Sequence, residues 1–201
     1  DDLSEVPDGA TVIFRSHGVP AAYYDRCADR NIKVIDCTCS FVRNTQRIVK
    51  DEYASGKAIV IVGEAAHPEV IGLQGWCNNS ALVVNDPSAD FGDIIDKDVC
   101  VVAQTTFSIE KFEKIIENIK NLCEKTVAVF KTICYTTYDR QFEAARLSSE
   151  CEAMLVIGGL NSSNTNKLYE ICLSHCNNVF RLSGPEDLDF DKIKKFKSVG
   201  I

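Results

Sequence analysis

The sequence contains an internal repeat that is anchored on two cysteines, Cys39 and Cys134. Each cysteine begins a stretch with helical polar and apolar periodicity, which leads into an apolar run, a glycine and a polar loop. The spacing from Cys39 to Gly63 equals the spacing from Cys134 to Gly158, so the repeat keeps its register from thiol to loop. Such a repeat indicates a duplicated α/β unit that presents one thiol and one polar loop per copy. The helical stretches and apolar runs are 40–55 and 58–62 in the first copy, and 135–149 and 153–157 in the second.

The repeat extends to the segments before each cysteine, which both read as strand, polar loop, helix and strand. This alternation predicts an α/β protein with mostly parallel sheets and right-handed crossovers. We divide the chain into a remnant of a first unit at 1–38, a second unit at 39–133 and an incomplete third unit at 134–201. On this interpretation the sequence is truncated at both ends. The expected elements are 11–14, 21–30 and 33–36 before Cys39, and 99–102, 109–122 and 127–130 before Cys134.

Composition favours a globular cytoplasmic protein. The chain has 201 residues, of which 45% are hydrophobic, and can form one large core or two small ones. Its net charge of −7 argues against contact with nucleic acid, because nucleic-acid-binding surfaces are usually basic. No apolar run approaches the roughly 18 residues that a membrane span needs, and no signal peptide is visible. A small anionic ligand is still compatible with this charge, because helix N-termini hold phosphate groups locally.

The chain has ten cysteines, which is many for a cytoplasmic protein. A disulfide framework is typical of small secreted domains with little core, so we interpret most of them, such as Cys100, as small buried hydrophobic residues. Cys172 and Cys176 lie one helical turn apart and could share a metal ion, but no other segment repeats this pair. Cys37 and Cys39 form a CxC motif in which only Cys39 is in register with Cys134. We expect the Cys37 thiol to point to the other side of an extended chain.

Polar loops follow the expected strands. The carboxyl ends of parallel strands meet at one edge of a sheet, where ligands collect in open α/β folds, so we expect a common cleft there. Simpler roles exist for single residues, since His17 before Gly18 is typical of a turn and 161–164 is typical of a helix cap. Two histidines and two cysteines in equivalent places favour a site over these separate roles. The expected cleft residues are His17, His67, Glu69, Thr105, Thr106, Ser162, Ser163 and Asn164.

Six short motifs occur in a fixed order along the chain. They are Ser16–Gly18, Asp36–Cys39, His67–Val70, Gln104–Thr106, Ile133–Tyr135 and Asn161–Asn164. Together they resemble the 4-hydroxy-3-methylbut-2-enyl diphosphate reductase family, whose members catalyse the last step of the methylerythritol phosphate route to isoprenoids. The resemblance covers the whole chain. It implies a trefoil of three repeated three-layer α/β units around a central iron–sulfur cluster.

The resemblance also implies a role for each matching residue. Cys39 and Cys134 correspond to two of three thiolate ligands of a 4Fe–4S cluster, the third of which lies outside this sequence. Glu69 corresponds to the proton source, and Thr105 to the threonine that orders the substrate alcohol. The implied reaction is the reductive removal of hydroxide from the substrate, which gives isopentenyl and dimethylallyl diphosphate, with a ferredoxin or flavodoxin as electron donor. The implied substrate-binding residues are His17, His67, Thr137, Ser162, Ser163 and Asn164.

Two other classes of protein stay open from the residues alone. One is a diphosphate-binding module without catalysis, against which the presence of Glu69, Cys39 and Cys134 argues. The other is a structural protein held by zinc or disulfides, which would have paired cysteines at short spacing outside the CxC motif. The chain departs from the family at Ser40, where many members have proline, and at the added thiol of Cys37. Without the third ligand, we expect this sequence by itself to lack a normal cluster and reductase activity.

Overall fold

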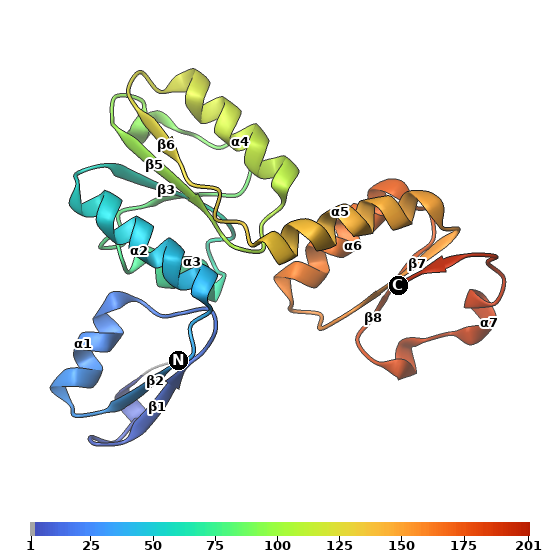
Figure 1. Cartoon of the computed structure of the whole chain (residues 1–201), viewed down its shortest axis with the longest axis horizontal. Helices are drawn as coiled ribbons and strands as arrows, with labels where there is room; N and C mark the ends of the chain where they lie inside the picture. The colour runs from blue at the N-terminus through green and yellow to red at the C-terminus, as the bar shows by residue number, and fades with distance from the viewer. Residues whose placement is uncertain (1–2) are drawn as a thin grey trace. The chain divides into compact units, whose positions relative to one another are not determined.

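The structure is a computed structural model that describes residues 3–201. The chain divides into two compact units. Unit 1 consists of 1–105 and 110–132, and unit 2 of 106–109 and 133–201. All of the sheets are parallel, and Figure 1 shows helices packed along them.

Unit 1 begins with a small sheet of two strands. The strands β1 (Thr11–Phe14) and β2 (Lys33–Asp36) pair in parallel, with Phe14 opposite Asp36, and the helix α1 (Ala21–Asp29) connects them. A 3₁₀ helix at Leu3–Glu5 precedes β1. Because one face of the sheet packs on α1, four apolar side chains form a separate core there. They are Leu3, Phe14, Cys27 and Ile32.

The second sheet of unit 1 has four strands in the order β4-β3-β5-β6. Its two central strands are almost wholly buried and rich in valine and isoleucine, as expected for a parallel sheet covered on both faces. The loops after β3 and β5 are therefore neighbours at the carboxyl edge. The strands are β3 (Ala58–Val62), β4 (Leu82–Val84), β5 (Val99–Ala103) and β6 (Val127–Val129), and the helices are α2 (Ser40–Ala54), α3 (Pro68–Gln74), a 3₁₀ helix at Gly92–Ile94 and α4 (Ile109–Leu122).

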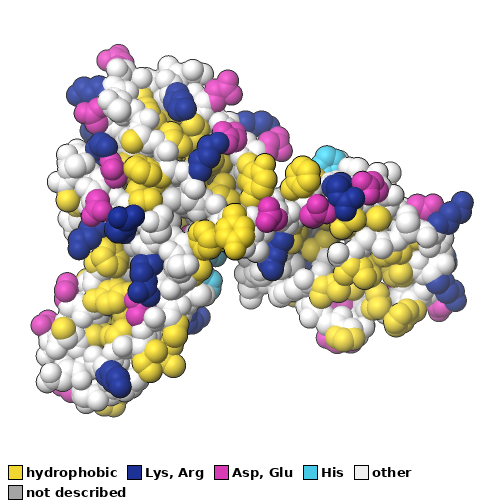
Figure 2. All heavy atoms as spheres, in the orientation of Figure 1, with side chains coloured by type: hydrophobic (Ala, Val, Ile, Leu, Met, Phe, Trp, Pro, Cys, Tyr) yellow, Lys and Arg dark blue, Asp and Glu magenta, His cyan; other side chains and the backbone are white. Residues whose placement is uncertain are grey.

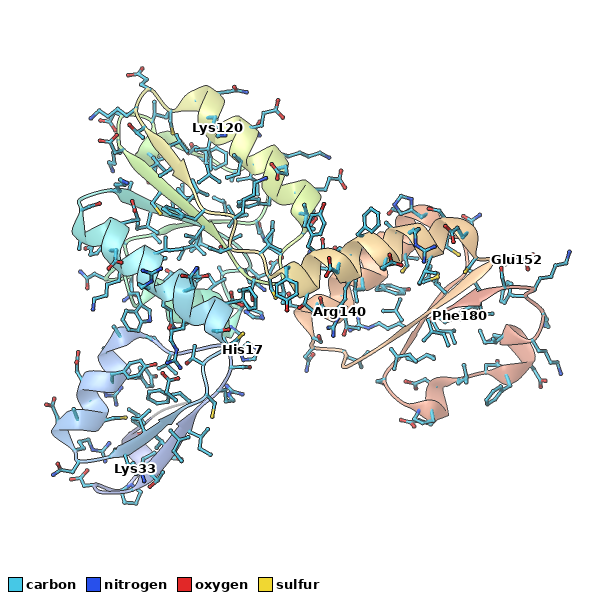
Figure 3. The ribbon with its side chains drawn as sticks, viewed as in Figure 1. His17, Lys33, Lys120, Arg140, Glu152 and Phe180 are labelled. Atoms are coloured by element: carbon cyan, nitrogen blue, oxygen red, sulfur yellow. The ribbon has the colours of Figure 1, made fainter. Side chains whose placement is uncertain are left out.

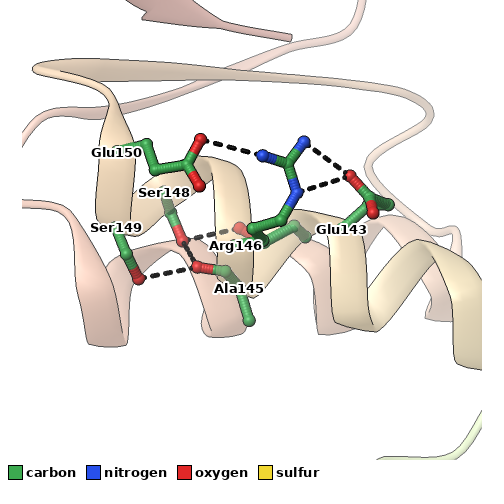
Figure 4. A network of polar contacts seen from close by, with 7 residues as sticks. Glu143, Ala145, Arg146, Ser148, Ser149 and Glu150 are labelled. Carbon is green, nitrogen blue, oxygen red and sulfur yellow. Dashed lines mark hydrogen bonds and ion pairs between the residues drawn. The ribbon is translucent and has the colours of Figure 1, made fainter.

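Unit 2 has a three-stranded sheet in the order β8-β7-β9, with β7 in the centre. Its two long helices, α5 and α6, pack against each other (Figure 1). Ion pairs on α5 join Arg146 to Glu143 and Glu150 on the exposed face of the helix (Figure 4). The elements are α5 (Tyr135–Glu150), β7 (Ala153–Ile157), α6 (Ser163–His175), β8 (Val179–Leu182), a 3₁₀ helix at Pro185–Asp187, α7 (Phe190–Ile193) and β9 (Val199–Gly200).

The predicted α/β class and the parallel sheets are confirmed. The strands 11–14, 33–36, 58–62 and 153–157 have the predicted bounds, while β6 ends at Val129 and α5 extends to Glu150. The short 3₁₀ helices and α7 were not expected from the sequence pattern. Each sheet falls within one of the three predicted ranges, and the division into three units stays a prediction.

The surface carries charged side chains of both signs (Figure 2), and half of the cysteines are buried. Figure 2 shows acidic and basic side chains interspersed over the visible face, with hydrophobic side chains between them. All ten cysteines are free; five are buried, including Cys100, whereas Cys123 is half-buried. Burial raises the pKa of Cys100 to about 12, which makes it an inert core residue. Among the described residues, no helix is both long enough and apolar enough to cross a membrane.

Candidate active site

Two histidines from different loops face each other in unit 1. The ring centroids of His17 and His67 lie 5.5 Å apart, and the rings are nearly perpendicular at 84°. His17 follows β1, at the carboxyl edge of its sheet and opposite the edge that holds Lys33 (Figure 3). The next residue is Gly18, with a φ of 72°, where an added Cβ would overlap the amide of Gln46. The structure therefore brings together two of the expected cleft residues, His17 and His67.

The local contacts fix the proton on the His67 ring. His67 is the N-cap of α3, and its Nδ1 accepts a hydrogen bond of 3.2 Å from the backbone N–H of Glu69. Burial lowers the pKa of His67, and the neighbouring His17 lowers it further. A ring that accepts at Nδ1 is neutral and carries its proton on Nε2, so His67 can act as a hydrogen-bond donor to a ligand.

The Nδ1 atom of His17 is a buried polar atom that a bound ligand would satisfy. Among the described residues, no group forms a hydrogen bond with its Nδ1. Buried polar atoms are normally paired, and an unpaired one in a functional protein points to a missing ligand or water. His17 and Pro68 also line a cavity of about 630 Å³. The first histidine is therefore placed to contact a bound molecule.

Glu69 lies in the first turn of α3 and is almost completely buried, with 2% of its surface exposed. Its Oε1 accepts a hydrogen bond of 2.7 Å from the backbone N–H of Thr105, and its Oε2 accepts one of 2.8 Å from the Thr105 hydroxyl. Burial raises the pKa of Glu69, although the two hydrogen bonds from Thr105 oppose the shift. A carboxyl group in this setting retains its proton to a higher pH than an ordinary glutamate.

Gln104 supports this arrangement and was not among the predicted site residues. It is fully buried, and its Oε1 accepts a hydrogen bond of 3.0 Å from the backbone N–H of Glu64. Gly63 allows the close approach, because a Cβ there would lie 2.9 Å from the Cβ of Gln104. Gln104 thus ties the loop after β3 to the end of β5. The motif that contains it was visible in the sequence, but its burial was not.

In unit 2, the loop after β7 leads into the start of α6. Ser162 is the N-cap of this helix, and its hydroxyl accepts a 3.3 Å hydrogen bond from the backbone N–H of Thr165. Arg181 on β8 donates to the carbonyl oxygens of Gly159 and Leu160, at 3.2 and 2.6 Å, and so fixes the loop. The first N–H groups of a helix have no partner within it and carry a partial positive charge. The predicted helix cap is therefore present, at a place suited to an anion.

Other polar groups gather around this loop. The hydroxyl of Thr106 donates to that of Ser163 over 3.2 Å. A cavity of about 580 Å³ is lined by Ser162, Asn164 and Arg140, together with apolar side chains of β7 and α6. Arg140 belongs to α5 (Figure 3). Thr137 is buried in the first turn of the same helix.

A buried glutamine connects the segment 106–109 to α5. Gln141 donates from Nε2 to the carbonyl oxygen of Phe107 over 2.9 Å and accepts from the N–H of Ile109 over 3.3 Å. The ammonium group of Lys167 lies 5.8 Å from the centre of the Phe107 ring, within cation–π range. Gln141 and Lys167 were not expected here, because neither pattern nor spacing distinguishes them from surface residues.

The two repeat cysteines have the same local structure. Cys39 is the N-cap of α2 with φ and ψ of −55° and 138°, and Cys134 is the N-cap of α5 with −62° and 136°. Neither side chain makes a capping hydrogen bond, and both thiols are free. Within the described part of the chain, no three metal-binding side chains are grouped closely enough to hold an ion. The donor chemistry nevertheless suits iron–sulfur ligation, because cysteine sulfur is the usual ligand of such clusters and both thiols are free of disulfides.

The expected residues thus form separate groups. Unit 1 joins His17 to His67 and Glu69 to Thr105, while unit 2 joins Thr106 to Ser163 at the start of α6. This α/β fold, with polar groups at the carboxyl edges of parallel strands, matches one known class over its full length. The LytB protein family matches residues 1–201, and the chain belongs to it. The resemblance predicted from the motifs is therefore confirmed.

Curated relatives and solved structures carry more specific names. A 4-hydroxy-3-methylbut-2-enyl diphosphate reductase of Thermoanaerobacter sp. (strain X514) is 41% identical over all of this chain and 69% of that protein. One of Alkaliphilus oremlandii (strain OhILAs) is 39% identical over all of this chain and 71% of its own length. The structure of E-1-hydroxy-2-methyl-but-2-enyl-4-diphosphate reductase from Plasmodium falciparum has a TM-score of 0.89 at 25% identity, over 99% of this chain and 64% of that one. This chain thus spans about two thirds of the length of these relatives.

Proposed function

We propose that the enzyme containing this chain reduces 4-hydroxy-3-methylbut-2-enyl diphosphate to isopentenyl and dimethylallyl diphosphate. Two electrons and two protons enter, the C–O bond of the allylic alcohol breaks, and the hydroxyl group leaves as water. The names of the relatives support this substrate, and the buried Glu69 is the observation that carries the chemistry. A ferredoxin or flavodoxin as electron donor and a cytoplasmic location belong to the same proposal. The ten free thiols suit a reducing compartment.

Glu69 supplies a proton in this proposal, and Thr105 passes it on. When Glu69 is protonated, its O–H donates to the Thr105 hydroxyl oxygen, 2.8 Å away. The Thr105 hydroxyl then donates its own proton to the departing oxygen of the substrate. The backbone N–H of Thr105 stays on the other carboxyl oxygen and holds the group in place. Such general acid catalysis contributes about 10²- to 10⁴-fold to rate.

The diphosphate is bound by neutral donors. His67 offers the N–H of a neutral ring, and Ser162, Ser163 and Asn164 form the start of α6, where anions are favoured. His17 contributes from the opposite loop, and Thr137 belongs to the same set of substrate contacts. Binding energy from the diphosphate orients the carbon skeleton without taking part in bond breaking.

Cys39 and Cys134 are the residues that we assign to the cluster. Their matching N-cap geometry and free thiols support this assignment. When bound, a 4Fe–4S cluster supplies electrons and a Lewis acid at the reacting alcohol. The role of the chain is to hold it with thiolates and to provide the proton and the anion contacts.

The test is Glu69→Gln in the cluster-loaded enzyme, with Glu64→Gln as a matched control on the same loop. Glu64 is half-buried and accepts a hydrogen bond from Asn85, so its replacement changes charge without touching Thr105. We expect Glu69→Gln to lower turnover by about 10²- to 10⁴-fold, with substrate still bound, and Glu64→Gln to stay near the wild type. Near-normal turnover of Glu69→Gln would remove Glu69 from the reaction. Binding without turnover in the wild type would favour a diphosphate-binding module instead.

A further inference from the structure

The chain stays extended beyond β2, through the CxC motif. The N–H of Cys37 donates to the carbonyl oxygen of Phe14, and the N–H of Cys39 donates to that of Ser16, each over 3.0 Å. These bonds continue the parallel pairing of Phe14 with Asp36 by one further two-residue step. The backbone from Asp36 to Cys39 therefore has strand geometry, although β2 formally ends at Asp36.

Strand geometry places the two thiols on the same face. Side chains alternate along an extended chain, so residues two apart point the same way. Burial agrees, because Cys37 and Cys39 are exposed, whereas Thr38 between them is 7% exposed. The expectation that Cys37 points to the other side of the chain was therefore wrong. The thiol of Cys39 also makes no capping bond to α2, which leaves it available.

Asp36 fixes this segment. Its Oδ1 accepts from the backbone N–H of Thr38 over 2.9 Å, and its Oδ2 accepts from the Tyr24 hydroxyl over 3.0 Å and pairs with Arg43 over 3.2 Å. Burial raises the pKa of Asp36, but the bonds from Thr38 and Tyr24 and the charge of Arg43 outweigh it and leave the pKa below its usual value. The ionised carboxylate thus holds the CxC backbone in one conformation.

We propose that Cys37 and Cys39 form a two-thiolate site for a soft monovalent metal ion, of which Cu(I) is the type. Thiolates select soft ions, and Cu(I) accepts two-coordination. The described residues offer no group of three ligands here, and zinc prefers four. Binding of one Cu(I) releases two thiol protons and leaves a complex of charge −1. That charge is stabilised by the N-terminus of α2 and by Arg43, which lies one turn into the helix.

The site shares one thiol with the cluster assigned above. Copper and iron compete for the Cys39 thiolate, so we expect bound copper to hinder assembly of the cluster; this consequence, unlike the copper site itself, rests on the proposed function. Cys37 then sets the affinity for copper without being an assigned cluster ligand.

The test is an anaerobic titration of this chain with Cu(I), buffered by the competing chelator bathocuproine disulfonate. We expect one tight site per chain that is weakened in both Cys37→Ser and Cys39→Ser. Loss of an outer-shell partner already weakens metal sites by about 10- to 100-fold, so loss of a ligand should cost at least as much. Cys123→Ser and Cys151→Ser, which remove half-buried thiols elsewhere, should bind as the wild type does. Far-ultraviolet circular dichroism confirms that each variant is folded.

Two outcomes would overturn the proposal. Tight Cu(I) binding that survives Cys37→Ser would place the metal elsewhere, and copper-edge absorption that shows any set other than two sulfur neighbours would contradict a two-thiolate site. Neither measurement uses the substrate, so their failure leaves the proposed reductase untouched. In a separate arm, one equivalent of Cu(I) should block cluster reconstitution in the wild-type enzyme and not in Cys37→Ser. Unhindered reconstitution of copper-loaded wild type would refute the shared ligand.

Discussion

The loops after β3 and β7 occupy equivalent places in the repeat, yet their side chains differ in charge and burial. Both lead into a helix whose N-cap side chain accepts a hydrogen bond from a backbone N–H; the N-cap is His67 in one loop and Ser162 in the other. Glu69 in the first loop has the same repeat position as Asn164 in the second. Glu69 is buried against the end of β5, whereas Asn164 lines an open cavity. In the proposed function, one scaffold thus provides a proton donor in unit 1 and contacts to the diphosphate in unit 2.

Among the variants of the second loop, the largest effect is expected when that loop is made to resemble the first. Asn164→Asp puts a negative charge where the diphosphate is proposed to bind. Because juxtaposed like charges cost several kcal/mol, we expect KM to rise by about two orders of magnitude, with a much smaller change in kcat. Steady-state kinetics would check this. Asn161→Asp, on the exposed part of the same loop, is the control. Equal effects of the two variants would show that general charge, rather than the position of Asn164, governs binding.

Removing hydroxyl groups from the same loop should have a smaller effect. A hydrogen bond to a charged group contributes about 1.5–3 kcal/mol, so Ser163→Ala should raise KM about tenfold or more and leave kcat nearly unchanged. Ser162→Ala should do the same and, because it removes the helix cap, lower the free energy of unfolding by about 1 kcal/mol. Steady-state kinetics measures the change in KM, and urea unfolding measures the change in the free energy of unfolding. A fall in kcat with unchanged KM would contradict an anion-binding role.

Glu69 in the first loop should change how the free energy of unfolding depends on pH. The folded-state pKa of Glu69 is raised, so the folded protein binds the proton more tightly than the unfolded chain does. The contribution of Glu69 to stability therefore falls as pH rises from the unfolded pKa of about 4.3 through the folded pKa. Urea unfolding at a series of pH values measures this effect. Between the unfolded and folded pKa values of Glu69, the free energy of unfolding should fall less steeply with pH in Glu69→Gln than in the wild type. Parallel curves for wild type and variant would mean that Glu69 titrates normally.

The smallest effect is expected away from both loops, on the exposed face of α5. Arg146 pairs with Glu143 at 2.9 Å and Glu150 at 2.8 Å, but its side chain is 45% exposed (Figure 4). Exposed helical ion pairs are screened by solvent and contribute little, so Arg146→Ala should lower the melting temperature only slightly. Thermal unfolding at low and high salt would measure it. A larger, salt-independent loss would assign Arg146 a packing role.

Much of this architecture was predictable because local pattern determines it. The apolar run of β3 and the matching run of β7 have the bounds that the pattern predicts, and the repeat placed Cys39 and Cys134 at equivalent helix starts. The contact between Glu69 and Thr105 was not predictable from pattern alone, because it depends on β5 lying next to β3 in the sheet.

The burial of two glutamine side chains was even less predictable from the sequence. Gln104 and Gln141 look like surface residues in the sequence, and only their tertiary partners explain their burial. The direction of Cys37, by contrast, could have been predicted from the alternation of an extended chain. The segment was correctly expected to be extended, but residues two apart in an extended chain point the same way, and this alternation was misapplied.

The central claim is that Glu69 holds a proton under conditions where an ordinary glutamate does not. Infrared difference spectroscopy between the wild-type chain and Glu69→Gln tests it directly, because a protonated carboxyl group absorbs separately from a carboxylate. We expect a carboxylic-acid band in the wild type that is absent from Glu69→Gln and that persists above about pH 4.3, the usual pKa of glutamate. If the difference spectrum contains only carboxylate bands just above that pH, Glu69 is ionised and cannot be the proton source.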